Sequence, residues 1–201
     1  MARGRPLSFD KANMLEKTLH TFWQSGYLGT SYTDICMATG LSKPSLYAAF
    51  GNKEEMFLAA LELYLDRHVR PAVVALANEA DPREGIRKLL VGTADGLTSE
   101  GTPLGCMIAS NIACAVAPEI PQPVADTLRK AARETPDAIR RRLQAASPQE
   151  LPSGASPASL ALFFEALISG LSGLARQGSS RADLLVVVDV AMLCWPCHPP
   201  Q

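Results

Sequence analysis

Residues 31–50 read SYTDICMATGLSKPSLYAAF, and this stretch decides the fold. It contains two short helix patterns joined by a turn at Gly40, a residue that tolerates the left-handed backbone ending a helix. Ser31, followed three residues later by Asp34, resembles a capping box at the start of the first helix. Ser42 can cap the second helix. This spacing predicts a helix-turn-helix, whose second helix can enter the major groove of DNA by its N-terminal end.

The polar residues around this motif suit contacts with a DNA backbone. Hydroxyl groups and free N–H groups at the start of the first helix suit a phosphate, and a basic arm at the N-terminus suits a minor groove. A helical hairpin inside an ordinary bundle has the same spacing, so the motif alone leaves both interpretations open. The candidate DNA contacts are Arg3, Arg5, Thr30, Ser31, Tyr32, Thr33, Lys43, Pro44, Ser45 and Lys53.

Outward from the motif, the whole chain is predicted to be helical, because strand-like alternation is nearly absent. The apolar run at 184–190 is assigned to a helix, since no turn signal interrupts it. The predicted helices run from Asp10 to Gly26 or Gly29, over 31–39 and 42–50, from Asn52 to a kink at Pro71, from Asp81, over about 106–116, from about 121 to 145 with a kink or break at Pro136, over about 157–177 and over about 180–194, with a loop at 147–157.

The charge of the chain is segregated along its length. The 201 residues are 47% hydrophobic and carry a net charge of −1, which argues against DNA binding by bulk charge alone. Residues 1–53, however, hold six basic and three acidic side chains, so the excess of acid lies in residues 54–201. No run of about 18 apolar residues predicts a membrane helix, and no signal peptide is evident. We therefore expect two domains, 1–53 and 54–201, a cytoplasmic location without membrane contact, and free cysteines.

A wider set of residues resembles the DNA-binding domain of the TetR family of transcriptional regulators. The resemblance covers about residues 7–60 and implies an all-α protein, with an N-terminal helix-turn-helix three-helix domain and a C-terminal helical ligand-binding and dimerisation domain. It also implies that Lys43, Pro44, Ser45 and Tyr47 face DNA, where Lys43 has the reach for guanine and Pro44 for a thymine methyl group. It rests on Phe22-Trp23, Gly26-Tyr27, Thr30-Ser31, Ile35, Gly40-Leu41-Ser42, Leu46-Tyr47-Ala48-Ala49-Phe50 and Lys53-Glu54-Glu55-Met56-Phe57.

The C-terminal part is expected to hold the dimer together and to take a small ligand. Residues 161–178 resemble the penultimate helix of the family, in which Gly170 and Gly173 would permit close approach of a second copy. A repressor released from a pseudo-palindromic operator by an unidentified inducer is the function implied, without a cofactor, metal or enzymatic activity. A carrier of small molecules that does not bind DNA is the alternative of another class. Candidate pocket residues are Leu97, Met107, Ile108, Phe163, Phe164 and Leu167.

Two cysteine patterns admit a chemical interpretation. Cys106 falls at a predicted helix start, where the helix dipole favours a thiolate, and the Gly-Cys pair looks like that of TetR-family members related to the regulator of N-ethylmaleimide reductase. The alternative function is therefore an electrophile or redox sensor acting through Cys106, against a plain packing role. Cys194-Trp195-Pro196-Cys197-His198 has the spacing of a c-type haem or redox motif. We expect a frayed chain end there instead, because export and a fourth zinc ligand both lack support.

Overall fold

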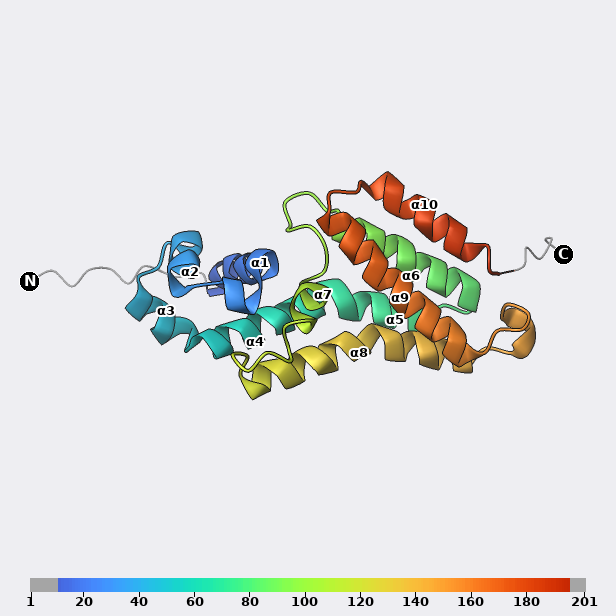
Figure 1. The fold of residues 1–201 in the computed structure, drawn as a ribbon, viewed down its shortest axis with the longest axis horizontal. Coiled ribbons are helices and arrows are strands. Elements are labelled where there is room, and N and C mark those ends of the chain that lie inside the picture. Colours follow the sequence, from blue (N-terminus) through green and yellow to red (C-terminus); the bar gives the residue numbers. More distant parts are fainter. Residues whose placement is uncertain (1–10, 196–201) are drawn as a thin grey trace, which may run out of the picture.

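The computed structural model describes residues 11–195, in which the chain is helical and contains no strand (Figure 1). The predicted cap Asp10, the predicted arm Arg3 and Arg5, and the motif residues Cys197 and His198 lie outside the described residues. The all-α prediction is confirmed. The helices are α1 (Lys11–Gly29), α2 (Tyr32–Thr39), α3 (Lys43–Phe50), α4 (Lys53–Tyr64), a π-helical turn (Leu65–Val69), α5 (Arg70–Asn78), α6 (Pro82–Leu97), α7 (Met107–Ile112), α8 (Gln122–Gln144), a 3-10 turn (Pro148–Glu150), α9 (Pro157–Arg176) and α10 (Arg181–Met192).

One end of the molecule is a small head made of α1, α2 and α3 (Figure 1). The predicted caps are present: Ser31 and Asp34 form a reciprocal capping box, and the Ser42 hydroxyl accepts the backbone N–H of Ser45 at 3.3 Å. Gly40 ends α2 with a φ of 75°, in the left-handed region. These contacts join residues that are close together in the sequence, so local interactions alone favour the helix-turn-helix.

The core of the head is aromatic and extends beyond the head. Phe57 of α4 lies edge-on to Phe22 and to Tyr27 of α1, with ring centroids 5.1 and 5.2 Å apart, and both phenylalanines are fully buried. The same buried cluster continues through Met107 of α7 and Leu128 of α8. The domain boundary predicted at residue 53 stays a prediction, since one core connects both sides of it.

Helices α4 and α5 form a rod that leads from the head into the body (Figure 1). Pro71 predicts an irregularity near Arg70, and the structure has one: a π-helical turn over Leu65–Val69 joins the two helices. Pro71 lies in the first turn of α5, directly after the π-helical turn. The rod therefore changes its winding at this point without breaking.

The body is built from α6, α8, α9 and α10 around a second buried cluster, which includes Leu90, Ile139, Phe164 and Val188. Its helices differ from the sequence prediction in two places. Pro136 lies inside an unbroken α8, so the predicted break is wrong, while the predicted kink stays a prediction. The helix predicted at about 106–116 ends at Ile112, because the chain then passes into i→i+3 turns that precede Pro121.

Helix α9 is long and apolar enough to cross a membrane by length and composition alone, although no apolar run in the sequence reaches the length expected of a span. A core helix of a soluble protein passes the same test. In the structure α9 packs against α6, α8 and α10, and only part of its surface is buried. Large apolar side chains of α9, among them Leu162 and Phe163, stay exposed.

Candidate DNA-binding surface and the joint behind it

The N-terminal end of α3 is the exposed tip of the head. Lys43, Pro44 and Ser45 are all exposed, as expected for residues that approach a groove. Leu46 is fully buried and anchors the helix to the core. The Ser42 hydroxyl lies 2.9 Å from the Ser45 hydroxyl, so both oxygens stand at the positive end of the helix. This arrangement places donors and a cation on one surface that an anionic duplex can reach.

Two stacked tyrosines link α2 to α3 beside this tip. The rings of Tyr32 and Tyr47 lie 5.0 Å apart with an interplanar angle of 25°. The Lys43 Nζ lies 4.9 Å from the centroid of the Tyr32 ring, so a cation–π contact restrains the lysine. The Tyr32 hydroxyl accepts the backbone N–H of Lys53 at 3.0 Å. Tyr32 thus organises three of the predicted DNA contacts around a half-buried ring.

The predicted contacts at the start of α2 divide into two groups. Ser31 and Thr33 are exposed, and the Ser31 hydroxyl and backbone N–H donate to the Asp34 carboxylate at 2.7 and 2.8 Å. These bonds lower the pKa of Asp34. Thr30 differs from the prediction, because its side chain is buried and its hydroxyl donates to the carbonyl of Gly26 at 2.7 Å. The Thr30 side chain closes the turn between α1 and α2 and is not on the surface.

Lys53 is half-buried, and its position differs from that of Lys43. Its Nζ lies 4.6 Å from the centroid of the Tyr27 ring. Burial lowers the pKa of Lys53, and the nearby Asp34 carboxylate acts against this shift. The phosphate contact of Lys53 stays a prediction, and its side chain has to leave the Tyr27 ring in order to make it.

Behind the head, α1 is bound to α7 and the loop before it by hydrogen bonds that join residues far apart in the sequence. The Trp23 indole N–H donates to the carbonyl of Gly105 at 2.8 Å. The backbone N–H of Tyr27 is left free by the kink at Gly26 and donates to Asn111 Oδ1, also at 2.8 Å. Sequence reasoning missed this joint, because its partners are more than 80 residues apart and no local pattern marks them.

The six predicted pocket residues are divided between two buried clusters and the surface. Met107 and Ile108 belong to the core shared with the head, whereas Leu97 and Phe164 belong to the core of the body. Phe163 is 44% exposed on α9. Leu167 is partly buried against the core of the body. Two cavities, of about 530 and 320 Å³, are lined by none of the six, so this pocket assignment stays a prediction.

Cys106 occupies a packing position, whereas Cys114 and Cys194 are exposed. Cys106 precedes α7, touches both cores, and its Sγ accepts the Tyr64 hydroxyl at 3.3 Å, while its backbone N–H donates to Ser172 Oγ. This engagement favours a packing role over the electrophile-sensing alternative.

Near the chain end, Trp195 is buried and its indole N–H donates to the carbonyl of Glu150 at 2.8 Å. The prediction of a frayed end after α10 is therefore wrong for the residues up to 195. No cluster of metal-ligating side chains occurs within residues 11–195.

Comparisons with known proteins agree with this geometry. The family model for bacterial regulatory proteins of the tetR family matches residues 14–60. The chain is 32% identical over 197 residues to the transcriptional repressor ComR of Escherichia coli K12, covering 97% of this chain and 93% of ComR. It is 27% identical over 188 residues to the repressor BdcR of the same strain, covering 94% and 90% of the two chains. A cysteine mutant of the TetR family regulator CifR, solved with a 26-base-pair operator duplex, matches with a TM-score of 0.85 and 34% identity over 96% of this chain and all of that one. The chain belongs to the TetR family of bacterial regulatory proteins and is a DNA-binding transcriptional regulator.

Proposed function

We propose that this protein is a repressor that binds operator DNA as a homodimer in the cytoplasm and leaves it when a small ligand binds. The observation that carries the proposal is the exposed tip of α3, where Lys43 is held over Tyr32 beside Ser45 and Tyr47. The relatives ComR and BdcR are both named as transcriptional repressors, which supports the sign of regulation. No enzymatic role is proposed, since the relatives named above are regulators.

The dimer is supported by an apolar face that α9 and α10 leave uncovered. Leu162, Phe163 and Leu174 on α9 are exposed, as are Val186 and Val190 on α10. Gly170 and Gly173 are exposed on α9, and a Cβ atom added at either would meet nothing within 4 Å. Small residues beside large apolar ones allow two helix pairs to pack closely, which a four-helix interface between two copies requires. Leu171 of the same helix is buried in the core of the body.

The ligand response is supported by how firmly the head is joined to the body. A buried core continues from α1 and α4 into α7 and α8, so a change in the packing of α7 is transmitted to the head. An inducer that binds better to the body of the free protein than to that of the DNA-bound protein shifts the equilibrium away from DNA.

We predict that Lys43→Ala weakens binding to DNA from upstream of the protein's own gene by about tenfold, because a cation at the tip of α3 is lost. The plot of log affinity against log salt should become less steep by about 0.9 for each phosphate contact that is lost. Fluorescence anisotropy of a labelled duplex at several salt concentrations measures both quantities.

Arg87→Ala is the matched control for this prediction. It removes one positive charge from α6, where Arg87 is exposed and makes only a long ion pair with Glu84, at 4.0 Å. The affinity for DNA should stay within about twofold of the wild type, because surface substitutions away from the site have small effects. Equal losses in the two variants would show that overall charge and not the tip of α3 binds DNA.

A further inference from the structure

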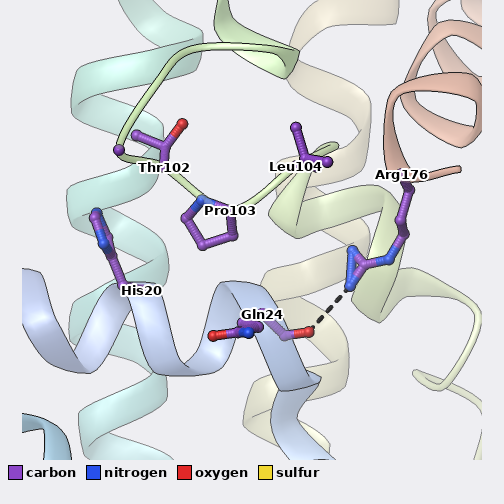
Figure 2. Close-up of a pocket in the computed structure, with 7 residues that line it drawn as sticks. His20, Gln24, Thr102, Pro103, Leu104 and Arg176 are labelled. Carbon is purple, nitrogen blue, oxygen red and sulfur yellow. Dashed lines mark hydrogen bonds between the residues drawn. The ribbon is translucent and has the colours of Figure 1, made fainter. Parts of the chain in front are cut away.

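A cavity of about 530 Å³, open to solvent on one side, lies at the joint between head and body. Figure 2 shows its lining, which comes from three separate segments. His20 and Gln24 project from α1 of the head, one helical turn apart. Residues 101–104, which connect α6 to α7, form a second wall, and Arg176 at the end of α9 forms the third. The volume falls within the range of pockets that hold small ligands.

Arg176 supplies the cavity with a positive charge that is not neutralised. Its guanidinium donates to the Ser110 hydroxyl. It also donates to the backbone carbonyl of Gln24 at 3.2 Å, the bond that Figure 2 shows as a dashed line. Both acceptors are neutral, and these bonds use two of the five guanidinium N–H groups. No carboxylate within the described part of the chain forms an ion pair with Arg176. A planar guanidinium in this state suits a carboxylate, which it can bind through two parallel hydrogen bonds.

The other walls of the cavity indicate which groups a ligand carries besides its carboxylate. Leu104 is 45% exposed, and Pro103 beside it adds apolar surface across from Arg176 (Figure 2). His20 offers a ring nitrogen, and its Nε2 lies 3.6 Å from the Glu16 carboxylate, which also pairs with Arg67. A ligand that satisfies these walls has an acid group at one end and a short apolar body at the other.

The cavity spans the joint, so its occupancy affects the orientation of the head. The Arg176–Gln24 bond ties α9 to α1 directly across it, and the Trp23–Gly105 bond holds the adjoining loop against the same helix. A carboxylate that takes over the Arg176 donors competes with the bond to Gln24. We propose that this cavity binds a small organic carboxylate through Arg176 and that the bound ligand changes the affinity of the head for DNA. Only the second part rests on the proposed function.

Calorimetric titration of the purified full-length protein with hexanoate and with the neutral hexanamide tests the site. We expect hexanoate to bind and hexanamide not to bind, because only the acid engages the guanidinium. Arg176→Gln should weaken hexanoate binding by about tenfold or more, since a charge-assisted bidentate contact is lost. Ser110→Ala, which removes one partner of Arg176 and keeps its charge, should bind hexanoate within about threefold of the wild type. An unchanged affinity in Arg176→Gln, or no binding of hexanoate up to about 10 mM, overturns the site.

A second measurement tests the coupling. Saturating hexanoate should change the affinity of the wild-type protein for its upstream DNA by about fivefold or more, in the range typical of coupled sites, and should leave that of Arg176→Gln unchanged. Binding of hexanoate by calorimetry with no change in DNA affinity overturns the coupling. If the ligand-free protein did not bind DNA at all, the proposed function would fail, while the calorimetric result would still decide the site.

Discussion

Replacing Val186 with arginine should separate the dimer into monomers and reduce operator affinity by about 100-fold or more. Val186 is 63% exposed on the uncovered face of α10, so in a symmetric dimer two copies of the new charge would be buried close together. In a dimer, binding of one head to its half-site of the operator holds the second head at a high effective concentration near the other half-site. A monomer has one head and loses this gain in affinity. Sedimentation velocity measures the assembly, and fluorescence anisotropy on a two-half-site duplex measures the affinity.

The matched control is Val74→Arg on α5. Val74 is 57% exposed, close to the value for Val186, but lies on the rod and not on the α9–α10 face. This variant should remain a dimer and bind DNA like the wild type. A Val186→Arg protein that sediments as a dimer would mean that α10 does not form the interface.

Phe57→Ala should lower the free energy of unfolding by about 3–5 kcal/mol, as expected for a large aromatic residue removed from a close-packed core. Phe57 is fully buried and lies edge-on to both Phe22 and Tyr27, so the truncation leaves a cavity where α4 meets α1. Urea denaturation at a fixed protein concentration measures the change, because the stability of a dimer depends on concentration.

Met37→Ala on α2 provides the comparison for this loss. Met37 is 71% exposed, so its truncation should change the free energy of unfolding by no more than about 0.5 kcal/mol. A loss below about 1 kcal/mol in Phe57→Ala would contradict a close-packed core in the head.

The head could be predicted from sequence because its signals are local. A capping box spans four residues, and the glycine that ends α2 lies next to the helix that it terminates. Each such signal lies within one helical turn of the sequence, and the structure confirms those at Ser31, Gly40 and Ser42. The error at Thr30 has a related cause. Its hydroxyl donates to the carbonyl of Gly26, four residues earlier, where the sequence pattern indicates a helix end but α1 continues past a kink.

The joint could not be predicted, because it is made by contacts between distant segments. Arg176 donates a hydrogen bond to Gln24, which is 152 positions away in the sequence. Neither residue belongs to a local sequence pattern that would predict this contact. The predicted apolar pocket shows the same limit. Hydrophobic periodicity marks a residue as buried, yet it does not tell which of two cores receives it, and Met107 and Phe164 go to different ones.

The π-helical turn between α4 and α5 changes the direction in which the side chains after it point. Leu65 and Leu76 are 11 residues apart, and in an uninterrupted α-helix they would point in nearly the same direction. A π-turn is equivalent to one inserted residue and rotates everything after it by about 100°. Leu65 accordingly packs into the core of the head and Leu76 into the core of the body. The same rod therefore contributes side chains to two cores on different sides of it. The deletion of a single residue from the turn would bring the side chains of α5 out of register with the core of the body.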